Sequence, residues 1–237
     1  MEMNKTPVER LSSLSNNLKY ENLPQNVIHN AKRIILDSLG CALVAYKEPV
    51  CRIVRQTVDP FVVEKKRPGY SRFIGGTHFF PAPLANLVSG SLIRCFDYND
   101  VLWGRDPSHP SSNLSVALTC TDMVSGSGKN VILGLVLGYE MQIRFIDFGG
   151  EPRLWDRGWD HSSTLAISAP LIAANLMKLS DEQAAHALAL SITHGSTLGE
   201  LRCGQIPMHK ASVEAFVSKN GIESVLLAKN GLTGPLN

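Results

Sequence analysis

The chain has 237 residues, of which 44% are hydrophobic, and its formal net charge is +2 at pH 7. This length and apolar content are sufficient for one sizeable core. The small charge argues against the strongly basic class of proteins that bind nucleic acids or anionic membranes. The basic triplet Lys65-Lys66-Arg67 is predicted to lie in a solvated loop.

The cysteines and the apolar segments indicate the cellular compartment. Five cysteines occur without CxxC spacing, which favours free thiols in a reducing environment over disulfides or a metal site. Residues 1–14 are polar and contain no signal-like apolar core, and no apolar window is long enough for a membrane span. We therefore expect a cytoplasmic protein.

Helical periodicity dominates the chain. Between residues 27 and 43 apolar side chains recur at steps of three and four, which predicts a long, largely buried helix that begins near Pro24. Similar apolar runs predict further helices at 82–93, 113–124, 130–146, 164–177, 181–193 and 212–229. Ser180 is the expected N-cap of the helix at 181–193, and Asn230-Gly231 is the expected stop of the last helix.

Strand signals are few by comparison, and they fall at 58–63 and 71–74. In the helix expected at 130–146, Gly134 and Gly138 lie four residues apart, which predicts the close approach of another helix and not a phosphate loop. The sequence therefore predicts an all-α domain in which apolar helices enclose other apolar helices.

A polar cluster follows the helix expected at 82–93. Asp97, Asp100 and His109 occur close together, and aromatic side chains flank them. The cluster can be a solvated helix cap, or it can line a cleft in which a carboxylate and an imidazole serve as acid and base near neutral pH. Pro110 favours an extended backbone at His109 and so helps to fix its direction.

Other histidines and one lysine also allow two interpretations. His161 lies in a polar loop that opens a buried helix, where Asp160 or Ser162 caps the helix or His161 acts as a proton donor at its positive end. His186 and His194 are expected to be packed helix residues, because no third metal ligand matches them. Lys210 lies in an apolar segment, where it binds a carboxylate or gives up its proton easily.

Several kinds of chemistry find no support in the sequence. No HxxxH, HxH or paired-cysteine spacing indicates a metal, and no Gly-x-Ser-x-Gly motif indicates a serine nucleophile. Gly75-Gly76-Thr77 is too short for a nucleotide cradle. The remaining histidines, aspartates and lysine suit proton abstraction next to a carboxylate, with elimination or decarboxylation of a polyacid.

Several short motifs together carry a family resemblance from about Pro7 to Asn237. In chain order they are Asp37-Ser38-Leu39-Gly40-Cys41, Phe96-Asp97-Tyr98-Asn99-Asp100, His109-Pro110-Ser111, Gly158-Trp159-Asp160-His161, Met208-His209-Lys210, Lys219-Asn220-Gly221 and Gly231-Leu232-Thr233-Gly234-Pro235. Their order and spacing resemble the MmgE/PrpD family, which includes 2-methylcitrate dehydratase, cis-aconitate decarboxylase and iminodisuccinate epimerase.

The resemblance implies a large helical domain and a smaller α/β lid domain, with the active site between them. It implies a cofactor-independent, homodimeric enzyme without a metal. The catalytic residues it implies are Asp97, His109, His161 and Lys210, and the substrate-binding residues are Tyr98, Asn99, Asp100 and Ser111. Asp97 with His109 is the expected proton-shuttling pair, and Lys210 and His161 are expected to serve substrate carboxylates or proton transfer. Val101 departs from the family, because many relatives carry a polar Thr there.

Family members are longer than this chain, so residues 1–237 are expected to be the helical domain of a truncated protein that lacks the lid. The expected function is a carbon–oxygen lyase of the 2-methylcitrate dehydratase type, in propionate metabolism, acting on a small tri- or dicarboxylate. The alternatives are a cis-aconitate decarboxylase, an iminodisuccinate epimerase-like enzyme, or an inactive helical remnant. A separate chain that carries the missing lid is an expected partner, besides a second copy.

Overall fold

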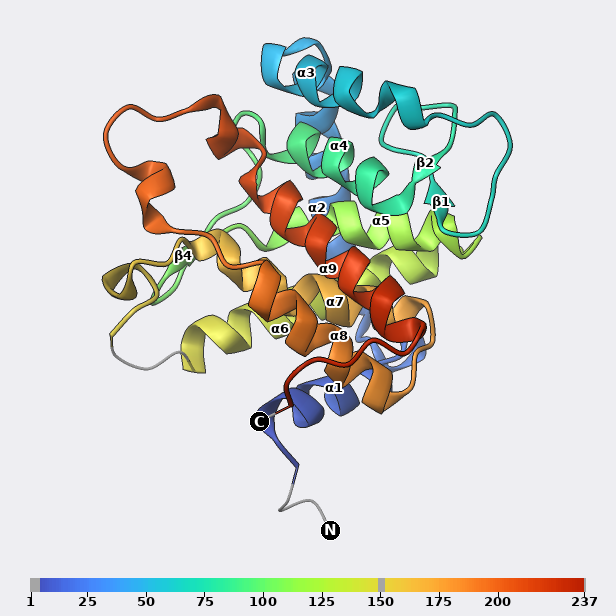
Figure 1. The fold of residues 1–237 in the computed structure, drawn as a ribbon, viewed down its shortest axis with the longest axis vertical. Helices are drawn as coiled ribbons and strands as arrows, with labels where there is room; N and C mark the ends of the chain where they lie inside the picture. Colours follow the sequence, from blue (N-terminus) through green and yellow to red (C-terminus); the bar gives the residue numbers. More distant parts are fainter. Residues whose placement is uncertain (1–4, 149–151, 237) are drawn as a thin grey trace.

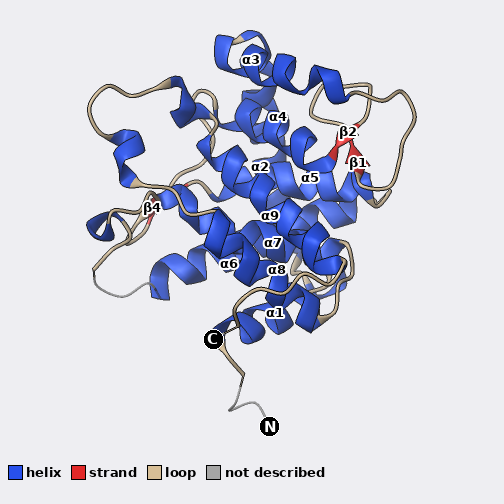
Figure 2. Ribbon diagram, viewed as in Figure 1, coloured by secondary structure: helices blue, strands red, loops and turns tan. Residues whose placement is uncertain are grey.

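The computed structural model describes residues 5–148 and 152–236, and these residues are mainly helical (Figures 1 and 2). The helices are α1 (Pro7–Asn17), α2 (Gln25–Val44), α3 (Pro49–Val58), α4 (Ala82–Arg94), α5 (Asn113–Met123), α6 (Gly128–Phe148), α7 (Leu165–Leu176), α8 (Asp181–His194) and α9 (Val213–Lys229). Two antiparallel pairs of two-residue strands join β1 (Tyr70–Ser71) to β2 (Phe80–Pro81) and β3 (Leu102–Trp103) to β4 (Pro107–Ser108). The prediction of an all-α domain is confirmed.

All seven predicted helices are present, and each of their ends lies within two residues of its predicted position. Ser180 caps α8 as expected, because its hydroxyl accepts a hydrogen bond from the Gln183 backbone. Sequence analysis missed α1 and α3. The signal for α1 was present, since Thr6 and Glu9 form a reciprocal capping box at its first turn.

Two expectations about strands in the N-terminal half are wrong. Val58 ends α3 and residues 59–61 form a 3-10 helix, so the strand expected at 58–63 is absent, and only Val63 pairs, with Phe79. Pro60 removes a ladder donor and favours the helical turn instead. The strand expected at 71–74 is reduced to the single position Ser71 in β1.

The helix expected to be largely buried, α2, buries only one face. Ile28, Ala31, Ser38 and Ala42 are buried, whereas Leu36 remains 74% exposed. Apolar residues at 27–43 therefore occupy more of the helix surface than the core covers. A three-to-four-residue spacing identifies the helix correctly, but it does not tell how many of the apolar positions find a partner.

Two large groups of buried side chains form most of the core, and a small third group consists of Leu165, Ala166 and Val217. One large group lies among α5, α6, α7, α8 and α9, and the other among α2, α3 and α4 with parts of α5 and α6. Helix α7 is buried along almost its whole length, and α9 packs against α4, α7 and α8 as it crosses the molecule (Figure 1). Apolar helices enclose other apolar helices, as the sequence indicates.

The glycines of α6 allow the close helix approach that their spacing predicts. A Cβ atom on Gly138 would lie 2.5 Å from Cβ of Asn113 in α5, and one on Gly134 would lie 2.9 Å from Cβ of Ala117. The two helices therefore approach each other over the positions that lack a side chain.

Burial keeps two of the cysteine thiols protonated. All five cysteines are free thiols, and Cys203 is exposed. Burial raises the pKa of the Cys51 and Cys120 thiols to about 12, so both stay protonated at neutral pH. Within residues 5–148 and 152–236, no helix combines the length and the hydropathy needed to cross a bilayer.

The close contact between α5 and α6 yields a test by substitution. We expect Gly138→Ala to lower the free energy of unfolding by about 1–3 kcal/mol, because the added methyl group overlaps Asn113. Gly40→Ala in α2 is the matched control. Its methyl group meets no atom within 4 Å, so stability should stay unchanged or rise by up to about 1 kcal/mol. Urea unfolding of both variants measures the difference, and equal stabilities would contradict the close approach.

Candidate active site

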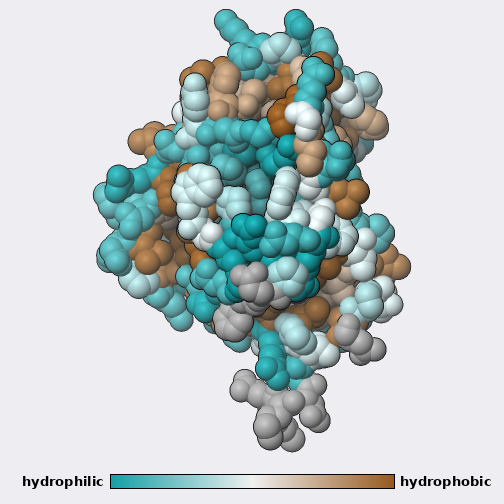
Figure 3. Space-filling model, turned by 90° about the vertical axis from the view of Figure 1, so that its left-hand side faces the viewer, coloured by the Kyte–Doolittle hydropathy of each residue, from teal (hydrophilic) through white to brown (hydrophobic). Residues whose placement is uncertain are grey.

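The polar residues singled out in the sequence lie in the segments that lead into α5, α7 and α9. These segments are on the left-hand side of Figure 1, and that side, seen face-on in Figure 3, shows a broad hydrophilic area. His109 precedes α5, His161 precedes α7, and Lys210 precedes α9. The N-terminal ends of helices carry partial positive charge, so this part of the molecule favours negatively charged groups.

Arg94, the last residue of α4, lies at the centre of the cluster and is only 2% exposed. Its Nε atom lies 2.8 Å from Oε2 of Glu214, and its Nη2 atom lies 2.5 Å from Oδ1 of Asp97. Its Nη1 atom donates a hydrogen bond of 2.7 Å to Oδ1 of Asn99. Burial alone lowers the pKa of Arg94, but the two carboxylates outweigh burial and raise it above its ordinary value.

The contact between α4 and α9 brings Arg94 to Glu214. A Cβ atom on Gly90 would lie 2.7 Å from Cβ of Ala215, so the two helices nearly touch one turn before Arg94. Glu214 is adjacent to Ala215 and is 2% exposed. Burial raises the pKa of Glu214, yet the nearby Arg94 charge and the His161 contact hold it well below its ordinary value. The Glu214 carboxyl is therefore ionised.

Asp97 and Lys210 form the exposed side of the cluster. Lys210 Nζ donates to Oδ2 of Asp97, and the two side chains are 32% and 37% exposed, respectively. Burial raises the pKa of Asp97, but Lys210 and Arg94 bring it below its usual range. Asp97 adopts a left-handed backbone with φ of +56°, a conformation that aspartate adopts more readily than most residues other than glycine.

A cavity of about 310 Å³ opens beside this ion pair. The residues that line it are Glu48, Pro49, Val50, Arg94, Cys95, Phe96, Asp97, Pro207, Met208, Lys210 and Ala211. Its polar groups are those of the ion pair, Arg94 and Glu48, and the rest of its lining is mostly apolar. A small molecule that carries carboxylates can reach the Lys210 ammonium from this cavity.

His109 is held as a neutral base. Its Nδ1 atom lies 2.7 Å from the backbone oxygen of Asp100, and a carbonyl oxygen only accepts, so Nδ1 carries the proton and Nε2 keeps its lone pair. Burial lowers the pKa of His109, an effect that the Glu214 charge partly offsets. At pH 7 the imidazole is thus neutral and its Nε2 atom is ready to accept a proton.

His161 faces His109 from the opposite segment. The two ring centroids lie 5.6 Å apart, and His161 Nε2 lies 3.4 Å from Oε1 of Glu214 and 3.2 Å from Nη2 of Arg202. Asp160 is the residue that caps the helical turn, since its side chain accepts from Ser162 N. The capping interpretation is therefore confirmed for Asp160. The His161 side chain faces the cluster, and its role as a proton donor stays a prediction.

The four residues predicted to bind substrate occupy different positions. Asn99 is buried, with its oxygen bound by Arg94 and its Nδ2 donating to Oγ of Ser111 at 2.8 Å. Asp100 accepts from the backbone N–H of Ser111 at 3.1 Å and from Tyr139 Oη at 2.5 Å. Tyr98 is 76% exposed and stacks on Phe96. Asn99, Asp100 and Ser111 thus fix the segment that carries Asp97 and His109, and their substrate contacts stay a prediction.

The structure brings Asp97, His109, His161 and Lys210 together through groups that sequence analysis missed. Arg94 contacts Asp97 and Glu214, and Glu214 contacts His161. The contacts pair Asp97 with Lys210 and place His109 beside His161, whereas the sequence-based hypothesis paired Asp97 with His109. A signal was available, because charged residues within apolar helical runs are rarely buried unless they are paired.

His109, His161 and Glu214 also have the donor types of a metal site. Their ligand atoms all lie within 4.8 Å of one another. Spacing rules missed this set because its members come from three separate segments. Two guanidinium groups, Arg94 on Glu214 and Arg202 on His161, contact the same donor residues and would repel a divalent cation. The donor set therefore fits a proton-transfer site better than a metal site, and the absence of a metal stays a prediction.

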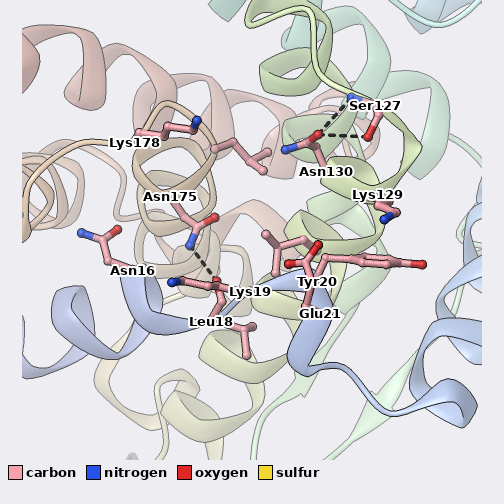
Figure 4. A pocket seen from close by; sticks show the side chains of 12 residues that line it. Asn16, Leu18, Lys19, Tyr20, Glu21, Ser127, Lys129, Asn130, Asn175 and Lys178 are labelled. Atoms are coloured by element: carbon pink, nitrogen blue, oxygen red, sulfur yellow. Dashed lines mark hydrogen bonds between the residues drawn. The ribbon is translucent and has the colours of Figure 1, made fainter.

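A second cavity lies away from this cluster and shares no residue with it. It has a volume of about 420 Å³ and lies between the segment after α1, the start of α6 and the end of α7 (Figure 4). Lys19, Lys129 and Lys178 contribute to its lining. His186 and His194 also lie outside the cluster. His186 is half-buried and contacts the Gly234 backbone oxygen, as expected for a packed helix residue. His194, the last residue of α8, is exposed and its ring contacts backbone and side-chain atoms of its own helix, so the expectation that it is packed is wrong.

The buried pair of Arg94 and Glu214 leads to a prediction on stability. Arg94→Met leaves the Glu214 carboxylate buried without its cation, so we expect the free energy of unfolding to fall by about 3–5 kcal/mol. Arg72→Met is the control, because the Arg72–Asp122 ion pair is partly exposed and its loss should cost less than about 1 kcal/mol. Chemical denaturation compares the two variants. A loss for Arg94→Met no larger than that of the control would contradict a structural role of the pair.

Comparisons with known proteins agree with the motifs. The model of the MmgE/PrpD N-terminal domain matches residues 9–237. The chain is 29% identical to the cis-aconitate decarboxylase-like protein oryM of Aspergillus oryzae, over 92% of this chain and 45% of that protein. It is 25% identical to 2-methylcitrate dehydratase of Salmonella typhimurium, over 92% of this chain and 46% of that protein. It is 26% identical to human cis-aconitate decarboxylase, over 98% of this chain and 48% of that protein. The chain therefore spans about half the length of these relatives, and it belongs to the MmgE/PrpD family through its N-terminal domain.

Proposed function

We propose that the chain provides the acid–base groups of a lyase that acts on a small tri- or dicarboxylate, most closely the dehydration of a 2-methylcitrate-like substrate. The observation that carries the proposal is the neutral His109, whose free Nε2 lone pair lies in a cluster with His161 and an accessible Lys210–Asp97 pair. The similarity to proteins named 2-methylcitrate dehydratase supports the substrate class.

Each group has a role in this proposal. Lys210 exchanges its Asp97 partner for a substrate carboxylate, and the positive ends of α5, α7 and α9 favour the remaining negative charge. His109 Nε2 takes the proton from the carbon next to a carboxylate. The hydroxyl group on the neighbouring carbon leaves with a proton supplied by His161, so that water and a carbon–carbon double bond are formed.

Decarboxylation of cis-aconitate is the second candidate. It is favoured by the 29% identity to a protein named cis-aconitate decarboxylase-like. In that reaction the carbon–carboxylate bond breaks, carbon dioxide leaves, and protonated His161 supplies a proton to the carbon that retains the electron pair. An epimerisation requires removal and return of a proton at one carbon, which the same groups support.

The surroundings of the cluster support the proposal that more polypeptide covers it. Large apolar side chains lie exposed in the same segments: Tyr98, Val101, Trp103, Leu198, Ile206 and Met208. Exposed apolar groups of this kind commonly mark surfaces that another domain or chain covers. We propose a lid-bearing polypeptide as this cover and a second copy of the chain as a further partner, with the chain assembling away from any membrane or nucleic acid.

Substrate turnover tests the function. The chain, alone and together with a lid-bearing polypeptide, is incubated with 2-methylcitrate and with cis-aconitate, and substrate loss and product are followed. We expect His109→Gln to lower kcat by about 100-fold or more, because a general base contributes about 10²–10⁴. His78→Gln, at an exposed histidine, is the control and should keep full activity. Loss of neither substrate, with the cover supplied, would favour the inactive remnant.

The pH dependence of turnover provides a second test. Because burial lowers the pKa of His109 below its ordinary value of 6.5, the base form should already predominate at pH 6.5. We expect kcat/KM to rise with pH through an apparent pKa below 6.5. A profile that rises only above pH 7 would assign the base to another group.

A further inference from the structure

One carboxylate oxygen of Glu214 accepts a hydrogen bond. The other has no hydrogen-bond partner among the residues that the structure describes. Oε2 accepts from Ser112 Oγ and lies 2.8 Å from Arg94 Nε. Oε1 is buried, and Nε2 of His161 lies 3.4 Å from it. A buried oxygen that lacks a partner is costly, so this oxygen calls for an explanation.

His161 Nε2 has two neighbours that require opposite states of that nitrogen. Arg202 Nη2, at 3.2 Å, only donates, so it binds Nε2 when this nitrogen carries a lone pair. Glu214 Oε1 only accepts, so it binds Nε2 when this nitrogen carries a proton. Nδ1 of His161 lies 3.9 Å from Asp160, beyond hydrogen-bonding distance. The state of Nε2 therefore decides which neighbour the ring binds.

We propose that Glu214 is a positioning residue whose Oε1 atom accepts a hydrogen bond from His161 whenever Nε2 of His161 is protonated, while Arg202 binds the unprotonated nitrogen. His161 then exchanges Arg202 for Glu214 as it gains a proton and reverses this as it loses one. The catalytic use of this exchange rests on the proposed lyase function. There it lets His161 hold a proton and release it without moving away from His109.

The charges around His161 support this assignment. Facing the ring are Glu214 from α9, Asp160 from its own turn, Arg202 from the segment before α9, and His109 from the segment before α5. Arg94 holds the pKa of Glu214 well below its ordinary value, so the carboxylate remains an acceptor throughout the range in which histidines titrate. A glutamine at this position would have the same shape without the charge.

Nuclear magnetic resonance of the chain with 15N-labelled histidine rings tests the assignment without any turnover. On acidification, the Nε2–H proton of His161 should exchange slowly with water, because it is bound to a buried carboxylate. In Glu214→Gln its exchange should become at least about tenfold faster, since a hydrogen bond to a charged group is lost. The pKa of His109 should also fall further, because the charge that raises it is removed.

Glu223→Gln is the matched control, since Glu223 lies on the same helix, is 42% exposed and pairs with Lys219. It should change neither quantity. If Glu214→Gln folds and leaves both the exchange rate and the pKa of His109 at the values of the control, the proposal is wrong. If Glu214→Gln does not fold, the unsubstituted chain still decides: a His161 Nε2–H that exchanges as fast as the ring of exposed His78 overturns the proposal. Neither outcome depends on whether the lyase function is correct.

Discussion

The buried guanidinium of Arg94 is the constraint on which the site depends. A charge taken out of water needs both counter-charges and hydrogen-bond acceptors, and Arg94 obtains them from Asp97, Asn99 and Glu214. These partners belong to the segment after α4 and to the start of α9. Because the Arg94 guanidinium contacts all of these partners, it fixes the position of Asp97. Through Glu214 it also fixes the surroundings of the histidine pair.

The helical scaffold makes this arrangement possible by its close contacts. Helix α9 packs against α4, α7 and α8, and the small residues Gly90 and Ala215 let α4 and α9 approach each other next to the Arg94–Glu214 pair. Rigid helices thus hold the buried charges, while the loops and short turns before α5, α7 and α9 carry the more exposed groups, His109, His161 and Lys210. A site built in this way is anchored in a packed core.

Sequence analysis predicted the helices well because apolar periodicity survives wherever a helix packs on a core, and it failed where composition was mixed. The polar, amphipathic α1 and α3 gave no long apolar run, and the β-branched residues near Val58 suggested a strand that Pro60 prevents. The motifs identified residues that lie together in space. Arg94 and Glu214 were missed because the crossing of two helices joins them. Their only signal was a charge within an apolar helical run, which does not tell which residue is the partner.

The ion pairs of the cluster have a consequence for how a charged ligand enters it. Arg94 lies against Glu214, Lys210 against Asp97, and Arg202 against Asp160, so each cation already has an anion of its own. Such a balanced set projects only a weak field into the solvent, and an approaching polyanion is not drawn in from afar. In the proposed function, capture of a polycarboxylate is instead a local swap of partners, and its rate depends little on ionic strength.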